Sequence, residues 1–277
     1  MKILFALLAA ACVAAGAAAE DKTVNAGPYV PSPQSVVSDM LKLANVGPND
    51  FVIDLGSGDG RIVLTAAKVF GARGFGVEIQ DPLVKRSNEA ARREGVADRV
   101  KFITRDLFKT DISPATVLTM YLLPDTVNLL RDKLLAELKP GTRVLSHDYP
   151  LGGWLPEQTV HMDLEDKVAI SGVTTTVIYL YVIPAKVAGS WNARMPAGIA
   201  KGGVRLELDQ QLTRVSGSAY INGREVALED VRLKGAQLSF RLAGRGGAKF
   251  TGTVNGSAIE GVVLARGAKS PWSATLK

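Results

Sequence analysis

The chain has 277 residues, with 33 Lys and Arg against 27 Asp and Glu, and its net charge is +6. This length exceeds that of one typical domain and favours two. The single cysteine excludes a disulfide framework, and because it is accompanied by only two histidines, the sequence predicts no catalytic metal site.

The first 19 residues have the composition of a secretory signal peptide. Lys2 precedes a continuous apolar run, and three alanines before Glu20 predict cleavage there. The run is short and alanine-rich for a membrane-spanning helix, which needs about 20 strongly apolar residues. Cys12 lies inside it, but Ala9 stands where a lipoprotein signal has a larger aliphatic residue, so a lipoprotein is the weaker alternative. We expect an exported protein, periplasmic or membrane-associated.

A proline-rich lead-in at residues 21–33 precedes the first predicted helix. Its three prolines exclude a helix in the lead-in itself. Apolar residues then recur at helical spacing from Ser35 to Ala44, and Gly47-Pro48 ends the pattern.

Residues 51–61 predict a buried strand, a glycine-rich loop and the start of a helix, which is the first unit of a doubly wound α/β fold. The glycines stand at every second position: Gly56, Gly58 and Gly60. Dinucleotide sites have the spacing GxGxxG instead, and Asp54 and Asp59 would repel a pyrophosphate. Two carboxylates suit a ligand with positive charge, such as S-adenosylmethionine (SAM), which carries a sulfonium and an ammonium group.

Two further strands are predicted, and an acid follows each of them. The strand at 74–79 contains Glu78, and the strand at 100–103 leads to Asp106. An acid at the end of the second strand typically binds the ribose hydroxyl pair, and one after the third strand can hydrogen-bond an adenine amino group. Between them we expect a helix that is capped by Asp81 and runs to Glu94. Three acids in this order predict a SAM-type site.

At this point the chain resembles class I SAM-dependent methyltransferases, through Asp54-Leu-Gly-Ser-Gly-Asp-Gly-Arg-Ile-Val63 and Gly76-Val-Glu-Ile79. Within that class it is most similar to the mitochondrial lysine methyltransferases of the ATP synthase c subunit and the adenine nucleotide translocase. The resemblance covers about Tyr29 to Ile183. Together with the strand-end acids it implies SAM as the cofactor, bound by Asp54, Gly56, Ser57, Gly58, Gly60, Glu78, Ile79, Asp106 and Leu107.

The acceptor side is predicted at the end of the fourth strand, residues 116–121. Tyr121 and Pro124 follow it in a Tyr-Leu-Leu-Pro sequence, without the Asn or Asp of enzymes that methylate amides or bases. Tyr121 can stack on a lysine amine, a cation–π contact worth ~0.5–2 kcal/mol, or it is a core residue with a satisfied hydroxyl. Tyr29 in the lead-in faces the reacting methyl group or only anchors the lead-in to the surface.

A helix at 126–138 and a fifth strand at 142–146 come next, and His147 and Asp148 follow that strand. Either side chain is placed to take a proton from the acceptor, with a structural histidine as the favoured alternative for His147. His161 has no partner that the sequence identifies. Residues 173–183 predict the last strand of the sheet.

From residue 188 onward the sequence predicts no helix and about eight short strands. Asn-Gly pairs between alternating segments indicate hairpins, and the pattern favours a small antiparallel barrel or sandwich. Trp191 and Trp272 stand near its two ends, so the first and last strands are expected to pair. We expect both tryptophans in the core rather than in a ligand site.

The predicted organisation is a signal peptide (1–19), a methyltransferase domain (20–186) and a β-rich domain (187–277). Residues 188–277 contain 13 basic and 6 acidic residues, a net charge of +7. This surface can face anionic lipid headgroups, an acidic partner or a cell-wall polymer, or it is simply solvated. Nucleic acid is disfavoured because aromatic residues are sparse and an exported protein seldom meets it.

The sequence therefore predicts methyl transfer from SAM to an amine, and the resemblance points to a protein lysine. Two alternatives stay open: a small amine, lipid or quinone-like acceptor, and an exported binding or scaffold protein that does not turn over. Export also conflicts with the cytoplasmic supply of SAM.

Overall fold

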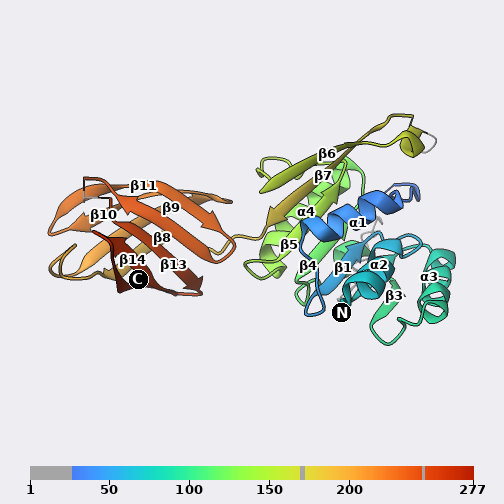
Figure 1. Cartoon of the computed structure of the whole chain (residues 1–277), viewed down its shortest axis with the longest axis horizontal. Coiled ribbons are helices and arrows are strands. Elements are labelled where there is room, and N and C mark those ends of the chain that lie inside the picture. The colour runs from blue at the N-terminus through green and yellow to red at the C-terminus, as the bar shows by residue number, and fades with distance from the viewer. Residues whose placement is uncertain (1–26, 169–171, 245–246) are drawn as a thin grey trace, which may run out of the picture.

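The structure is a computed structural model that describes residues 27–168, 172–244 and 247–277, and two lobes follow each other along its long axis (Figure 1). The predicted signal peptide, with Cys12, lies outside the described residues. The first lobe is a mixed sheet with helices, and the second is made of strands (Figure 1). The first lobe ends with a strand at Val182 and the second begins at Gly189, on either side of the predicted boundary.

The first lobe is built on a seven-stranded sheet in the order β3-β2-β1-β4-β5-β7-β6. The strands are β1 (Phe51–Leu55), β2 (Arg73–Glu78), β3 (Val100–Thr104), β4 (Val117–Met120), β5 (Arg143–His147), β6 (Gln158–Asp163) and β7 (Thr175–Val182). The first five are parallel, and β7 runs antiparallel to β5 and β6. This confirms the predicted Rossmann-like sheet. The strand order reverses between β1 and β4, and ligands bind at such a point.

Helices cover both faces of the sheet. They are α1 (Gln34–Leu43), α2 (Arg61–Phe70), α3 (Asp81–Arg93) and α4 (Pro124–Glu137), with short 3-10 helices η1 (Leu107–Lys109) and η2 (Glu165–Lys167). The apolar sides of α1 and α2 share one core with the sheet, and α4 shares the other. α3 starts at Asp81 and Gln80 takes the N-cap position, so Asp81 is not the cap that the sequence predicted; its carboxylate bonds to Thr104 and approaches Lys85.

The sheet ends in a hairpin of β6 and β7, where the sequence predicted only one strand. β6 was missed because it is an edge strand with polar and exposed residues, so it lacks a buried apolar run. His161 lies exposed on this strand.

The second lobe is a closed barrel of eight antiparallel strands, as the barrel alternative of the prediction had it. The strands are β8 (Gly189–Arg194), β9 (Val204–Gln211), β10 (Arg214–Ile221), β11 (Arg224–Lys234), β12 (Gln237–Leu242), β13 (Lys249–Asn255), β14 (Ala258–Ala265) and β15 (Ala268–Leu276). Each pairs with the next in sequence, and β15 closes the ring on β8, which confirms the predicted pairing of the first and last strands.

Aromatic side chains fill the barrel. Phe240 and Phe250 stack with ring centroids 4.8 Å apart, and Trp272 packs edge-on against both at 5.5 Å. Trp191 is fully buried, and its indole N–H donates to Val187 O at 2.8 Å. Both tryptophans therefore belong to the core, as predicted.

The barrel is joined to the first lobe by fixed contacts. Gly235, in the β11–β12 turn, accepts a hydrogen bond from Ala185 N at 2.8 Å and packs on Gly141. The Gln210 side chain bonds to the backbone of the connecting segment, at Ala185 O and Val187 N. Gly141 lies just before β5, so the barrel sits at the amino ends of the parallel strands. No helix among the described residues has the length and apolar character needed to cross a bilayer.

Candidate active site

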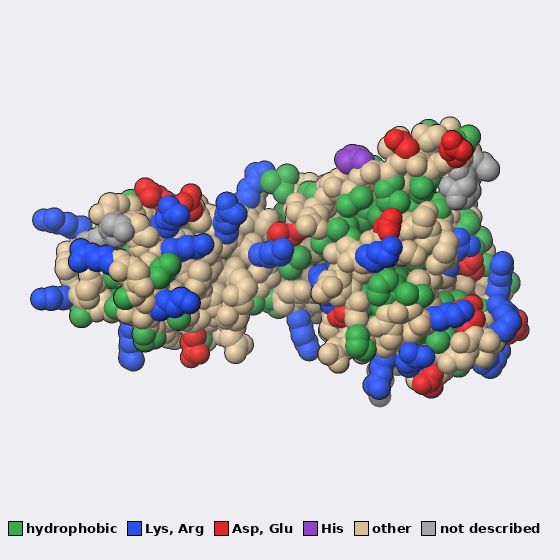
Figure 2. Space-filling model, in the orientation of Figure 1, with side chains coloured by type: hydrophobic (Ala, Val, Ile, Leu, Met, Phe, Trp, Pro, Cys, Tyr) green, Lys and Arg blue, Asp and Glu red, His purple; other side chains and the backbone are tan. Residues whose placement is uncertain are grey.

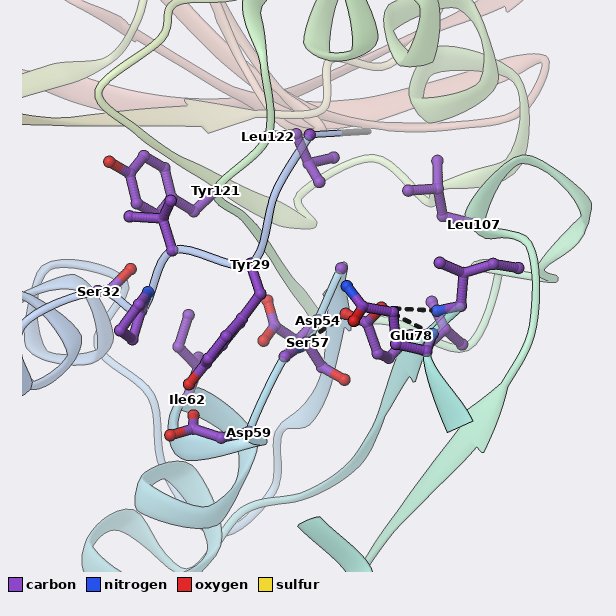
Figure 3. Close-up of a pocket in the computed structure, with 18 of the residues that line it drawn as sticks. Tyr29, Ser32, Asp54, Ser57, Asp59, Ile62, Glu78, Leu107, Tyr121 and Leu122 are labelled. Atoms are coloured by element: carbon purple, nitrogen blue, oxygen red, sulfur yellow. Dashed lines mark hydrogen bonds between the residues drawn. The ribbon is translucent and has the colours of Figure 1, made fainter. Parts of the chain in front are cut away.

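A cavity of about 400 Å³ opens at the carboxyl ends of β1, β2 and β4 (Figure 3). The barrel packs on Gly141 at the amino end of β5, so it lies at the opposite edge of the sheet. This volume is within the usual range for small-molecule sites, roughly 300–1,000 Å³. Its walls come from the glycine loop, the β2–α3 loop, the segment after β3 and the β4–α4 loop. Residues 27–33, called the arm below, cover it from one side, and residues 27–32 line it.

The glycine loop approaches its neighbours too closely for any other residue. Gly56 (φ +76°) and Gly58 (φ +52°) line the cavity, and a Cβ on them would lie 2.7 Å from Leu122 and 2.5 Å from the Tyr29 ring. Gly60 is different, because it caps α2 and packs against Phe102 without lining the cavity. Its role in binding the cofactor stays a prediction, and the structure places this residue beside the cavity wall, where it starts and packs the helix.

Asp54 is the carboxylate at the centre of the site. It lies near the end of β1 opposite Thr119 of β4, whose hydroxyl donates to Asp54 Oδ1 at 2.7 Å. Burial raises the pKa of Asp54 to about 7; the Thr119 bond opposes this, and the carboxylates of Glu78 and Asp59 add to it. A buried, poorly compensated acid of this kind is stabilised in its ionised form by a cationic ligand.

Asp59 does not offer its charge to a ligand, contrary to the electrostatic argument from the sequence. Arg61 binds it through two bonds, at 2.9 and 2.6 Å, and the Tyr29 hydroxyl points towards it (Figure 3). Burial alone would raise the pKa of Asp59, but the Arg61 guanidinium holds it below its usual value. Arg61 also donates to Ser32 O at 2.7 Å, so this pair ties the arm down on the loop.

Glu78 holds two loops of the cavity in place. Its Oε2 accepts from Gly58 N at 3.1 Å, and its Oε1 accepts from Ile79 N and Gln80 N at 2.8 and 3.0 Å. A carboxylate has about four acceptor sites, so Oε2 keeps capacity for a further donor such as a hydroxyl. Ile79 lines the cavity although its side chain is exposed.

Beyond β3, Asp106 lines the cavity and accepts from Phe108 N at 2.8 Å, which starts η1 and places Leu107 on the wall. Ile79 and Leu107 together offer apolar surface to a flat ring. The predicted cofactor residues are therefore brought to one cavity, with Gly60 beside it.

Ser57 supplies a direct test of whether SAM suits this cavity. Its hydroxyl is buried in the wall and makes no hydrogen bond within the described part of the chain. Such a group is costly unless a ligand satisfies it. SAM provides a partner for each of these residues, so the residues fit it. It carries a cation for Asp54, ribose hydroxyls for Glu78, an apolar ring for Ile79 and hydrogen-bonding groups for Ser57. Within the described residues, no group of three or more His, Cys, Asp and Glu could hold a metal ion.

The acceptor side of the cavity is aromatic and apolar. Tyr121 and Leu122 line it, and the Tyr121 hydroxyl points away and donates to Asp148 Oδ2 at 3.1 Å (Figure 3). Burial, followed by the Asp148 carboxylate, raises the pKa of Tyr121 well above its ordinary value, so the phenol stays neutral. Pro124 is exposed at the start of α4 and does not line the cavity, so its predicted catalytic place is not supported.

Asp148 and His147 are not placed to accept a proton from a substrate, since neither lines the cavity. Burial would raise the pKa of Asp148, but Lys167 Nζ at 2.6 Å and its other donors hold it below the usual value. His147 is fully buried, and burial lowers its pKa to about 4. The geometry therefore does not support the prediction of Asp148 as a catalytic residue, and it favours the structural alternative for His147.

Sequence reasoning missed Ser32 and Arg61, which line the cavity and fasten the arm. The only local signal was the charge of Arg61 directly after an acidic glycine loop. The two residues lie 29 positions apart in the chain, and only the fold brings them together.

Comparison with known proteins supports this site. A family model for the ANTKMT methyltransferase domain matches residues 54–158, which does not reach the barrel. A protein-lysine N-methyltransferase of Saccharolobus islandicus is 43% identical over 157 residues, 56% of this chain and 93% of that protein. The adenine nucleotide translocase lysine N-methyltransferase of Mus musculus is 38% identical over 133 residues, 48% of this chain; that match covers only 58% of the mouse protein.

A solved structure is similar in both sequence and fold. The RNA methyltransferase of Salinibacter ruber, crystallised with S-adenosylhomocysteine (SAH), is 49% identical, with a TM-score of 0.52. The match covers 57% of this chain and 96% of that one, which corresponds to about the size of the first lobe.

The ionisation of Asp54 makes SAM binding pH-dependent. A cation binds the ionised carboxylate, so lowering the pH from 7.5 to 5.5 protonates a group with a pKa of about 7 and should weaken binding at least tenfold. Isothermal titration calorimetry across this range measures the effect. Asp54→Asn should bind more weakly at pH 7.5 and lose the pH step, whereas Asp98→Asn, at an exposed carboxylate, should keep the wild-type profile. A flat profile in the wild type would contradict the role of Asp54.

Ser57 and Ser87 form a matched pair for testing the cofactor wall. Ser57→Ala removes a hydroxyl without a described protein partner, so SAH affinity should fall about three- to tenfold while thermal stability stays the same. Ser87→Ala removes a hydroxyl bonded to Gly58 O and Leu83 O and should cost about 1–2 kcal/mol of unfolding free energy. Unchanged SAH affinity in Ser57→Ala would show that this hydroxyl has no ligand partner.

Proposed function

The chain belongs to the family of SAM-dependent methyltransferases that includes the protein-lysine N-methyltransferase of Saccharolobus islandicus, and we propose that it methylates the ε-amino group of a lysine in a protein. The observation that carries this proposal is the acceptor side of the cavity. Tyr121 and Leu122 form an aromatic and apolar wall next to Asp54, with the Tyr121 hydroxyl turned back into the protein. Such a wall suits an alkyl amine rather than a hydrogen-bonding base edge.

We assign the cofactor residues by the part of SAM that each one suits. Asp54, Gly56, Ser57 and Gly58 hold the methionine end, Glu78 the ribose, and Ile79, Asp106 and Leu107 the adenine. SAM supplies an activated methyl group on a sulfonium. The arm covers the cavity through Tyr29, which excludes water, and the rigid glycine loop fixes the alignment that dominates catalysis of this kind.

The lysine must lose its proton before it attacks, and the described residues on the acceptor side of the cavity offer it no general base. Asp148 and His147 lie behind Tyr121, and Asp59 is engaged by Arg61. We infer that the amine loses its proton to solvent and enters the channel neutral. The Tyr121 ring then stabilises the positive charge that develops on nitrogen, by about 0.5–2 kcal/mol.

Two other classes of methyl acceptor are alternatives to a protein lysine. The solved relative from Salinibacter ruber is titled an RNA methyltransferase, so RNA is the second candidate. The wall argues against it, because the segment after β4 is Tyr-Leu-Leu-Pro and lacks the amide or carboxylate that would hold a base amino group. A small amine or lipid fits the wall as well as a lysine does, and the relatives named for protein lysine favour the latter.

Methyl transfer from labelled SAM should therefore appear on lysine in a protein extract. We expect mass spectrometry to find ε-N-methyl-lysine, and kcat/KM to rise about tenfold per pH unit between pH 7 and 9, since free lysine has a pKa of about 10.4. Tyr121→Ala should lower kcat/KM about two- to thirtyfold, the rate equivalent of about 0.5–2 kcal/mol, and leave the SAH dissociation constant within twofold.

The same assay offers RNA and a lipid extract as acceptors beside the protein. Label in RNA or lipid and none in protein would overturn the lysine assignment while leaving the methyltransferase family intact. A loss of SAH binding in Tyr121→Ala would instead show that this residue belongs to the cofactor wall.

We also propose that the protein is exported and that the barrel contacts an anionic surface of the cell envelope. Basic side chains project from the barrel lobe (Figure 2). Strand register puts Arg241, Lys249, Leu264 and Lys269 in one row across four strands, and Leu264 is exposed. Arg241 already pairs with Asp230 at 3.5 Å, and an anion lying on the row would offset the remaining repulsion between its lysines. The barrel occupies the edge opposite the cavity, so this contact would leave the acceptor side open.

Cell fractionation and vesicle binding test this second proposal. The protein should start at Glu20 in the periplasmic or membrane fraction, and it should sediment with anionic but not zwitterionic vesicles, less so at high salt. Lys249→Gln/Lys269→Gln should weaken sedimentation more than Arg214→Gln/Arg224→Gln, which removes equal charge elsewhere on the barrel. An unprocessed chain in the cytosol, or equal effects of both pairs, would count against it.

A further inference from the structure

A line of buried hydrogen bonds joins the arm over the cofactor to the aromatic wall of the acceptor channel. It runs from Ser32 through His147, Thr176 and Asp148 to Tyr121 and is called the relay below. We propose that the relay is a positioning device, which couples closure of the arm over SAM to the placement of Tyr121. The acceptor half rests on the proposed function, and the cofactor half stands without it.

The first end of the relay is the arm itself. Ser32 lines the cavity three residues after Tyr29, which covers Gly58, and its side chain is buried. Its Oγ lies 2.8 Å from His147 Nδ1, while its carbonyl accepts from Arg61 at 2.7 Å. Backbone and side chain of one residue thus fix the arm to two elements, the start of α2 beside the glycine loop and the end of β5.

Proton positions along the relay follow from the carboxylate. Thr176 donates its single hydroxyl hydrogen to Asp148 Oδ1 at 2.9 Å, so its oxygen is the acceptor towards His147 Nε2 at 2.6 Å. Nε2 therefore carries the imidazole hydrogen, and the bare Nδ1 accepts from the Ser32 hydroxyl. A neutral His147 in one tautomer is what holds the arm.

Asp148 is the point where the two ends meet. Its Oδ1 serves the arm side through Thr176, and its Oδ2 serves the acceptor side through Tyr121. Lys167 from η2, nearly fully buried, donates to Oδ2 at 2.6 Å, and Val177 N donates to Oδ1 at 3.1 Å. A rotation of this one carboxylate would therefore disturb both ends together.

The position of the relay residues indicates a role in function as well as in stability. Asp148 has a left-handed backbone (φ +61°), a conformation that Asp tolerates better than most residues and that here turns its carboxylate towards Thr176 and Tyr121. Buried polar chains seldom stabilise a fold more than apolar packing would, but they do fix a single arrangement. The relay residues come from the arm and from the ends of β4, β5 and β7. The relay therefore fixes the arm relative to the strand ends that carry the acceptor wall.

The first experiment reads the relay without any methyl acceptor. His147 and His161 are the only histidines of the chain, so nitrogen-15 NMR of the imidazoles resolves both, with exposed His161 as the internal reference. We expect His147 to show the Nε2–H tautomer and to stay neutral above pH 5. An Nδ1–H tautomer would overturn the proposed direction of the relay.

The second experiment compares two buried threonines. Thr176→Val breaks the relay, whereas Thr142→Val breaks a bond to Ala115 O at the opposite edge of the sheet. Thr176→Val loses two hydrogen bonds, one of them to a carboxylate, and Thr142→Val loses one, so the larger loss of thermal stability is expected in Thr176→Val. Only Thr176→Val should raise the SAH dissociation constant, by about three- to tenfold. Equal dissociation constants in the two variants would overturn the coupling to the cofactor.

The third experiment reads the acceptor half. Ser32→Ala should raise the acceptor KM about three- to tenfold with little change in kcat, and Ser38→Ala on α1 should not. The double variant Ser32→Ala/Tyr121→Phe should raise the acceptor KM by less than the product of the two single increases, because both substitutions interrupt the same relay. Multiplicative effects would overturn the coupling. If no protein lysine is methylated, the proposed function fails, and the tautomer and SAH affinity still decide the cofactor half.

Discussion

The site is organised by the electrostatic cost of one buried carboxylate. Asp54 lies near the end of the central strand, where neighbouring strands on both sides exclude water, and a single hydroxyl compensates it. Parallel pairing sets that compensation, because the β1–β4 register places Thr119 beside Asp54 and the β1–β2 register places Gly76 on its other side. Gly76 in turn leaves room for Ser57, whose buried hydroxyl makes no hydrogen bond within the described residues. A cation at this edge satisfies what the sheet alone leaves unsatisfied.

The acids of the sequence pattern divide into two roles once they are folded. Asp54 leaves its negative charge to be balanced by a ligand. Asp59, Glu78 and Asp148 accept most of their hydrogen bonds from protein groups. Asp59 and Arg61 fasten the arm, Glu78 fastens the loops, and Asp148 fastens the acceptor wall. Rigidity of this kind is what a reaction needs when its donor is already activated and alignment is the main task.

Local patterns in the sequence were sufficient for most of the fold. Apolar runs predicted the five parallel strands, the glycine spacing predicted the loop at the end of β1, and Asn-Gly turns predicted a barrel or sandwich of about eight strands. Long-range pairing was not accessible in the same way. Arg61 and Asp59 lie two positions apart in the chain, but the link from Arg61 to Ser32 depends on the arm folding back. Asp148 was predicted as a base because its partners, Lys167 from η2 and Thr176 from β7, reach it only in the folded protein. β6 was not predicted because, as an edge strand, it lacks the run of buried apolar residues by which the other strands were recognised.

The position of the barrel bears on how the enzyme meets its acceptor. Gly235 packs at the amino end of β5 and the cavity opens at the carboxyl ends of the same sheet, so the two features lie at opposite edges of one rigid element. The barrel interior is filled by Trp191, Phe240, Phe250 and Trp272, which leaves its outer surface for contacts. A domain placed there cannot shape the acceptor channel directly. It can set the orientation of the catalytic lobe on whatever surface it contacts, and the cavity would then face away from that surface. An acceptor reached in this arrangement must project well clear of the surface, which a lysine on an extended protein segment does more readily than a lipid headgroup within a bilayer.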